Sequence, residues 1–288
     1  MITPTLLKET FEDFIADKAM RLSAALAYYS VFSLAPLLII AIAIAGAIFG
    51  EDAARGAIEE QLTGSVGRES AIAVQGMLKS AGQGNQSGLM TLVGFGILLI
   101  TASGVFAQLK DAMNTVWGIE PRPGQGIKGI FRARLLALSM VLVIGFLLLI
   151  SLVLSAVTAV LTTWLGDTLP IPGFVFQLLS FIISLAVTTL LFAMIFKILP
   201  DAEVQWRDVW SGAFLTSILF SIGKFGLAIY LGREGAASAY GAAGALILLL
   251  TWVYYSANIL LLGAEFTQVY ARSRGRRIQP KKNAIRLT

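Results

Sequence analysis

Cysteine and histidine are both absent from this 288-residue sequence, and only 14% of its residues are charged. Without cysteine the chain can form no disulfide and offers no thiolate. Without histidine it lacks the commonest general base and metal ligand. No nucleophile–base pair is visible either, so we expect no enzyme, no cofactor and no metal site. An ordinary soluble domain carries about 25% charged residues, so this chain has too few for a water-soluble fold.

Hydrophobic residues are abundant instead: they make up 57% of the sequence, and the mean hydropathy is +0.79. A transmembrane helix needs about 20 mainly apolar residues. We therefore expect an all-α polytopic membrane protein with one membrane domain over residues 1–271 and a basic cytoplasmic tail over 272–288. Six stretches are long enough to span a membrane, near residues 22–49, 89–109, 135–164, 173–197, 209–231 and 240–266.

Lysine and arginine are unevenly distributed between the two sides of these spans. Seventeen fall in the terminal segments and in the second and fourth connections, and four fall in the remaining connections. Cytoplasmic segments carry the excess of Lys and Arg, so both termini should be cytoplasmic. The tail "ARSRGRRIQPKK" fits this rule and could also bind anionic lipid headgroups. No aromatic or folded platform accompanies it, so nucleic acid is not an expected partner.

Two other segments have predictable local structure. "LLKETFEDFIADKAM" places Leu7, Phe11, Phe14 and Ile15 on one helical face, which predicts a short amphipathic helix on the inner membrane surface. Residues 51–88 should form two short helices that cap the outer side.

Prolines should interrupt the helices at two places. Pro36 should kink the first span, because proline removes a backbone donor. The helix of the second span should continue through "AQLKDAMNTVW" and stop at Pro121 and Pro123.

Four segments carry a resemblance to a known family. They are "RLSAALAYYSVFSLAPLLI", "FAQLKDAMNTVWGIEPRPG", "LPDAEVQWRDVWSGAFLTSILFSIGKFGLAIYLG" and "AYGAAGALILLLTWVYYSANILLLGAEFTQVYA". Together they resemble the YihY/BrkB family of bacterial inner-membrane proteins. The resemblance implies a six-helix fold in the inner membrane with both ends inside, and the family is suspected in lipid or solute export. Some members were once described as tRNA-processing ribonucleases, an activity that a chain without histidine or an inner acidic cluster does not fit.

Lys224 is the one charge well inside an expected span, in "TSILFSIGKFGLAIYLG". A lysine at a helix centre costs about 2.5 to 3.5 kcal/mol on insertion scales. It continues a stripe of small and polar residues through Ser217 and Ser221, which favours a protein-facing or water-filled surface over lipid. The alternative is a lysine that snorkels to the outer surface, about 9 Å away at about 1.5 Å per residue.

Tyr28 and Tyr29 in the first span, and Tyr254 and Asn258 in the sixth, could line the same cavity as Lys224. They offer hydrogen bonds to a headgroup without adding charge. Glu265 lies near the inner end of the sixth span, too deep to reach Lys224, and we expect it to pair with a cation such as Arg21. A proton or substrate site is the alternative for Glu265.

These features favour a transporter or exporter of an amphipathic or anionic, lipid-like molecule, with membrane lipids and that substrate as partners. No nucleotide-binding motif is present, so energy would come from a gradient, a partner or downhill flow. The alternative is a membrane scaffold or envelope-assembly factor that transports nothing. The sequence leaves the substrate and the formation of a homo-oligomer open.

Overall fold

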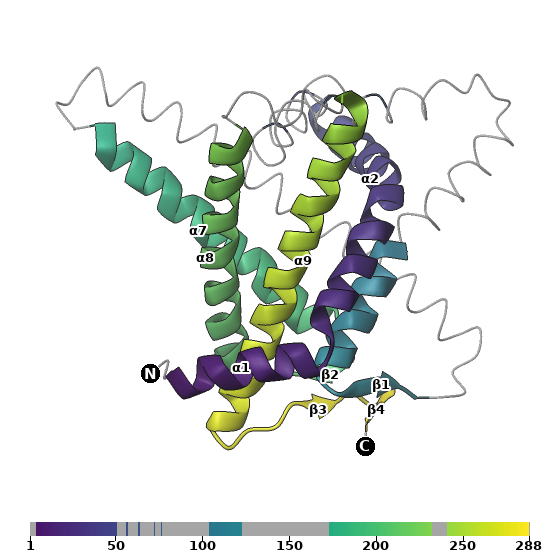
Figure 1. Cartoon of the computed structure of the whole chain (residues 1–288), viewed down its shortest axis with the longest axis vertical. Helices are drawn as coiled ribbons and strands as arrows, with labels where there is room; N and C mark the ends of the chain where they lie inside the picture. Colours follow the sequence, from purple (N-terminus) through teal and green to yellow (C-terminus); the bar gives the residue numbers. More distant parts are fainter. Residues whose placement is uncertain are drawn as a thin grey trace, which may run out of the picture.

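The computed structural model describes residues 4–50, 104–122, 173–231 and 241–287, together with residues 56, 63, 72 and 76. These residues are mostly helical, and two small two-stranded sheets lie at one end of the helices (Figure 1). The chain ends are marked at this same end, N beside helix α1 and C below strand β4 (Figure 1). We call this end the base.

Four long helices rise from the base: α2 (Ala19–Phe49), α7 (Gly173–Ile198), α8 (Trp206–Leu231) and α9 (Gly241–Ser273). Leu178–Ile198, Trp206–Leu227 and Leu246–Ser273 are each long and apolar enough to cross a membrane. They match the last three expected spans. The expected spans at 89–109, except for its last six residues, and at 135–164 lie outside the described residues, as does nearly all of the expected cap over 51–88.

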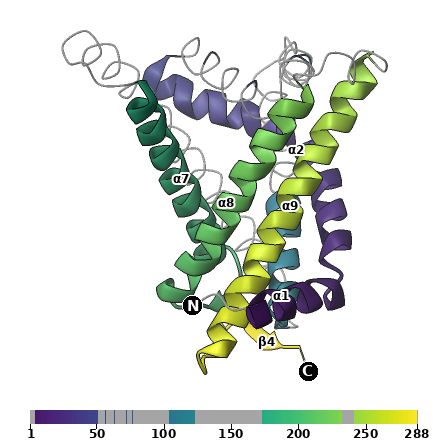
Figure 2. The same cartoon turned by 60° about the vertical axis from the view of Figure 1, so that its left-hand side comes forward.

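Helix α9 is the common partner of three other helices. It packs against α8, α2 and α1, whereas α7 packs against α8 (Figures 1 and 2). It continues seven residues beyond the end expected at residue 266. The apolar run ends there, but the added turns pack against α1, and this contact keeps polar sequence helical.

Helix α1 (Pro4–Ala16) lies across the base and runs crosswise to the long helices (Figure 1). Leu7, Phe11 and Ile15 are exposed along one side, as an amphipathic helix on a membrane surface requires. Phe14 does not join them as the sequence suggested. It is buried in the core, since α1 packs one side against the bundle.

Helix α2 changes direction between its first part, drawn in dark purple, and its second part, drawn in lighter purple (Figure 2). Pro36 lies near the middle of the helix. Proline cannot donate the hydrogen bond expected at its position, so a bend in this region is its ordinary effect.

The helix over residues 104–116 ends earlier than predicted. Gly118 adopts φ +60°, a left-handed conformation that glycine accepts without strain, and so the helix stops before Pro121. Strand β1 (Ile119–Pro121) follows and pairs with β4 (Ala284–Arg286).

Strand β2 (Ala202–Glu203) follows α7 and pairs with β3 (Gln279–Pro280). The segment after α9, which the sequence suggested only as a basic tail, therefore runs back under the bundle. There it joins two loops that are distant in sequence.

Candidate functional site

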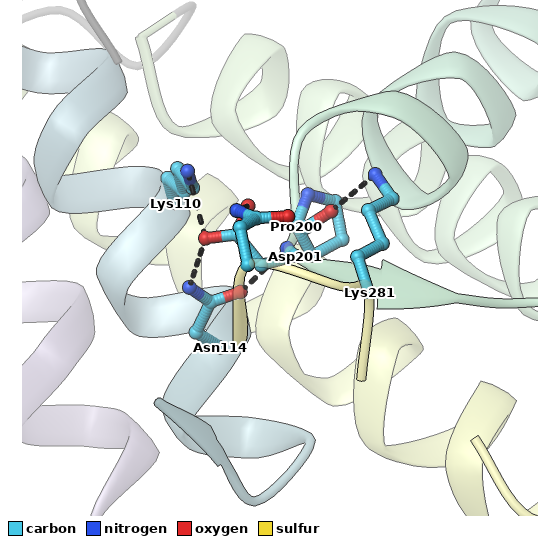
Figure 3. A network of polar contacts seen from close by, with 6 residues as sticks. Lys110, Asn114, Pro200, Asp201 and Lys281 are labelled. Carbon is cyan, nitrogen blue, oxygen red and sulfur yellow. Dashed lines mark hydrogen bonds and ion pairs between the residues drawn. The ribbon is translucent and has the colours of Figure 1, made fainter. Parts of the chain in front are cut away.

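Asp201, in the connection between α7 and α8, is the centre of a polar network at the base (Figure 3). Lys110 Nζ lies 2.8 Å from Asp201 Oδ2, and Asn283 Nδ2 donates to Asp201 Oδ1 at 2.9 Å. Asn114 bonds this residue twice: its Nδ2 donates to Oδ2 at 3.3 Å, and its Oδ1 accepts from the Asp201 backbone N–H at 2.9 Å. Asp201 thus joins the 104–116 helix, the α7–α8 connection and the C-terminal segment.

Lys281 completes this network from the strand side. Its Nζ donates to the Pro200 carbonyl at 2.7 Å, and its backbone N–H donates to the Asp201 carbonyl at 2.9 Å. Burial raises the pKa of Asp201, but the hydrogen bonds from Lys110, Asn283 and Asn114 outweigh burial and hold this pKa below its ordinary value. Burial lowers the pKa of Lys281; Asp201 opposes this shift and the charge of Lys110 adds to it.

A pocket of about 570 Å³ opens at the base, between the ends of α7 and α9, the start of α8 and strand β3. We call it the base pocket. It is lined by Lys197, Glu203, Val204, Gln205, Trp206, Arg207, Asp208, Ala271, Arg276, Arg277, Ile278 and Gln279.

Positive charge predominates in the base pocket. Arg276 bonds both oxygens of Asp208 through two nitrogens, so this carboxylate is neutralised. The other charged residues that line the pocket are three cations, Lys197, Arg207 and Arg277, and one anion, Glu203. Since α8 begins at this pocket, the positive end of its dipole adds to the attraction for an anion.

Trp206 and Trp210 stand beside the base pocket as a tilted pair, and both are exposed. The Lys197 ammonium lies 5.7 Å from the Trp206 ring centroid and donates to the Val204 carbonyl. Exposed tryptophans at the end of an apolar helix are typical of the membrane–water interface. The pocket therefore combines cationic groups with the aromatic surface that an amphipathic molecule would meet.

Glu265 is not paired with Arg21. Arg21 is exposed, whereas Glu265 is fully buried and forms no ion pair with any described residue. Instead, the carboxyl group of Asp17, in the turn between α1 and α2, lies within hydrogen-bonding reach of Glu265. The predicted pair fails because Arg21 lies on the outward side of the first turn of α2.

Lys224 is half-buried on α8, and the stripe below it faces protein. Ser217 is fully buried, and its hydroxyl lies 2.7 Å from the hydroxyl of Thr189 on α7. Ser221 donates to the Ser217 carbonyl. Phe214, on a different side of α8, is half exposed. A polar path beside Lys224 stays a prediction.

The other predicted cavity residues occupy two helices. Tyr28 and Tyr29 are exposed on α2. Their rings pack edge to face, with ring centroids 5.9 Å apart. Tyr254 is partly exposed on α9, and Asn258 donates to the Tyr254 carbonyl. Both helices pack together, but none of these four residues lines the base pocket.

Sequence reasoning missed Asp201 and the base pocket. "LPDAEVQWRDVW" suggested only a structural turn, and the basic segment after α9 suggested only an inner end. The sequence did carry a signal. An aspartate between two apolar spans needs hydrogen-bond donors when it is buried, and "QLKDAMN" offers the Lys110 ammonium and the Asn114 amide one helical turn apart.

Comparisons with known proteins agree on the kind of protein. A family model described as "Virulence factor BrkB" matches residues 10–288. A UPF0761 membrane protein of Verminephrobacter eiseniae is 30% identical over 263 residues, which cover 89% of this chain and 60% of that protein. A second, from Pseudoalteromonas translucida, is 30% identical over 84% of this chain and 78% of its own length.

The coverage of these relatives varies. A UPF0761 membrane protein of Psychrobacter sp. is 26% identical over 88% of this chain, but the match covers 46% of that protein. Several relatives are thus considerably longer than the part that this chain matches. No solved structure matches the chain.

Proposed function

Since the chain belongs to the Virulence factor BrkB family and is an integral membrane protein, we propose that it moves an amphipathic anionic molecule across the bacterial inner membrane. A lipid-like substrate is the class that fits best. The base pocket carries this proposal: cationic groups lie at the end of three apolar helices, where a charged headgroup would enter.

The orientation follows from charge. The base holds the terminal segments and the connection between α7 and α8, all of which belong to the side with seventeen lysines and arginines. Under the positive-inside rule the base faces the cytoplasm. The base pocket would then receive its substrate from the cytoplasmic side of the membrane.

The pocket has the chemistry for a phosphate or carboxylate headgroup. Arg207 and Arg277 offer several N–H donors in a fixed planar arrangement, which suits bidentate bonding to an oxyanion. Trp206 offers an apolar surface to the part of the molecule next to its headgroup. Basic pockets between helices on the cytoplasmic side are recognised sites for anionic lipid headgroups.

Lys224 would act at a later stage. It lies eighteen residues beyond the start of α8, about 27 Å along the helix at about 1.5 Å per residue. A half-buried cation at that height could attract the headgroup away from the base, with Ser221 as a neutral hydrogen-bonding group below it. In this scheme the base pocket selects an anionic headgroup, and Lys224 helps that headgroup cross the membrane.

The direct test is movement of lipid in vesicles that contain the purified protein. A fluorescent phosphatidylglycerol analogue should cross these vesicles faster than protein-free ones, and a phosphatidylcholine analogue should not. With the double variant Arg207→Gln/Arg277→Gln, the phosphatidylglycerol analogue should cross no faster than in protein-free vesicles. Lys282→Gln, an exposed lysine outside the pocket, is the matched control and should retain it.

Lys224→Met separates movement from capture. This variant should still bind phosphatidylglycerol, measured by native mass spectrometry, but should no longer move it. If wild-type protein binds the anionic lipid and yet gives no faster movement than empty vesicles, the chain is a scaffold with a lipid site. Equal binding by wild type and the pocket double variant would end the assignment of the pocket.

A further inference from the structure

An acidic stripe runs along the side of α1 and the following turn that faces α9. Glu9, Asp13 and Asp17 are spaced four residues apart, so they lie on one side of a helix. Arg272 of α9 lies 2.8 Å from Asp13 and 3.7 Å from Glu9. Asp17 instead meets Glu265, two helical turns earlier on α9.

Glu265 is the buried member of this group. Its side chain is 0% exposed, and Oε1 receives no hydrogen bond from any N–H or O–H group of the described residues. The Gln268 amide nitrogen, when turned toward it, donates to Oε2 at 3.3 Å and to the Val116 carbonyl at 3.0 Å. Glu265 is therefore a fully buried acidic group with one oxygen still in need of a donor.

The carboxyl groups of Asp17 and Glu265 lie within hydrogen-bonding reach of each other. Two ionised carboxylates cannot hydrogen-bond, since both are acceptors only. A hydrogen bond between them therefore needs one proton, which would also satisfy the buried acid. Asp13 and Arg272 are the other charged groups that act on Glu265, so four carboxyl groups, counting Glu9, share a single guanidinium among the described residues.

We propose that Asp17 and Glu265 form a proton-binding site that fastens α1, the helix across the base, to α9. While the proton is bound, the two carboxyl groups attract. When it leaves, two negative charges face each other in a buried place where the nearby guanidinium, that of Arg272, is already paired with Asp13 and Glu9, and α1 is repelled from α9. The site does not depend on the transport proposed above.

The alternatives to a proton are weaker at this place. The described residues contain no group of three acidic, histidine or cysteine side chains that could hold a metal ion.

Burial raises the pKa of Asp17 above its ordinary value; the hydrogen bond with Glu265 opposes this shift and Asp13 adds to it. A raised folded-state pKa means that stability is present at low pH and lost as pH rises through that value.

The first experiment measures the melting temperature of the purified full chain in detergent from about pH 5 to about pH 9. The wild type should melt several degrees lower at the alkaline end. Glu265→Gln should remove this fall and melt at least as high as the wild type at alkaline pH. Glu12→Gln on the exposed side of α1 is the matched control and should keep the wild-type profile.

Infrared spectroscopy gives a readout that a purely structural role would not move. The wild type should show the C=O stretch of a protonated carboxyl at neutral pH, and Glu265→Gln should lose it. If that variant does not fold, Asp17→Asn serves, because Asp17 lies in a half-buried turn. Absence of the band in the wild type at neutral pH overturns the proposal even if neither variant can be made.

Motion of α1 can be followed on this cysteine-free background. Spin labels on cysteines placed at Lys8 and Ser273, both exposed, should report a longer or broader distance at alkaline pH. With Glu265→Gln the distance should not change with pH. A melting temperature that rises with sodium at alkaline pH would identify a metal-cation site instead and would overturn the proton assignment.

Discussion

Gly212 of α8 lies directly against Thr267 of α9. A Cβ atom added to Gly212 would come 1.8 Å from Thr267 Oγ1 and 2.7 Å from the Gly263 carbonyl oxygen. The relation is reciprocal, because a Cβ on Gly263 would lie 1.7 Å from Thr216 Oγ1. Each helix thus presents a glycine to the other's threonine, and their backbones approach as closely as small residues allow in a membrane.

Gly263→Ala should destabilise the contact between α8 and α9 by about 1 to 3 kcal/mol, the usual range for overpacking. The nearest atoms belong to the side chains of Thr216 and Phe196. Adding Thr216→Ala should therefore restore part of the loss, as thermal melting in detergent would show. If Gly263→Ala melts like the wild type, the helices are not in the contact described.

Gly212→Ala should behave differently. Its added Cβ meets a backbone carbonyl as well as Thr267, and a backbone atom cannot be trimmed away. Thr267→Ala should accordingly rescue Gly212→Ala less than Thr216→Ala rescues Gly263→Ala. Equal rescue of the two pairs would contradict the geometry at Gly212.

Removing the carboxylate of Asp201 should loosen the base. Asp201→Ala leaves Lys110 and the two asparagines without their acceptor, and breaking a buried ion pair costs about 3 to 5 kcal/mol. The pKa of Asp201 is lowered in the folded protein, so its contribution is present above about pH 4 and is lost as pH falls through the lowered value.

Unfolding curves of the wild type and Asp201→Asn at falling pH would check this. The wild type should approach the variant in stability only under strongly acidic conditions. Glu120→Gln, an exposed acid on β1, is the control and should follow the wild type throughout. A constant difference between wild type and Asp201→Asn at every pH would show that the charge is not what stabilises the network.

Deleting residues 279–288 should destabilise the base although no membrane-spanning helix is touched. The deletion removes β3 and β4, together with Asn283 and Lys281, which bond Asp201 and Pro200. Faster trypsin cleavage at Arg122 and a lower melting temperature would follow from the loss of both strand pairs. A chain that lacks only Thr288 should match the wild type in both measurements.

The hydrogen bond between Thr189 and Ser217 should be worth little. Their hydroxyl oxygens are 2.7 Å apart between α7 and α8, yet interhelical hydrogen bonds in membranes average about 0.6 kcal/mol in double-mutant cycles. A cycle of Thr189→Val and Ser217→Ala should give a coupling of about that size. A coupling above about 2 kcal/mol would mark this contact as functionally special rather than ordinary packing.

The helices α7, α8 and α9 were predictable because length and hydropathy report the thickness of the membrane directly. The family was predictable because the motifs are long, and that resemblance is confirmed. Single residues of the Asp201 network carried a signal, but their meeting was not predictable, since Asn114 and Asn283 lie 87 and 82 residues from Asp201 and no local pattern links them. A one-dimensional charge count assigns Arg276 and Arg277 to an inner end but cannot place them around a pocket.

The predicted pairing of Glu265 with Arg21 is not formed for a related reason, and the alternative of a proton or substrate site stays a prediction. Its position along the span placed several cations at the same depth in the membrane. Pairing with one of them was expected because an unpaired buried carboxylate is strongly destabilising. The position of Asp17 depends on the turn after α1, where Lys18 adopts φ +55°. The sequence did not predict this left-handed conformation. Proton sharing between two acids is a solution that counts of opposite charges do not reveal.

The central position of α9 bears on how the chain is synthesised. This helix is the last in the described part of the chain, and α1, α2 and α8 all pack against it. During translation the earlier helices therefore leave the ribosome and enter the membrane before their shared partner exists. Glycine and threonine faces on α8, and the acids of α1, must wait in the bilayer or at its surface, where chaperones and proteases can reach them. The packing among α1, α2, α8 and α9 can be completed only when α9 has been made.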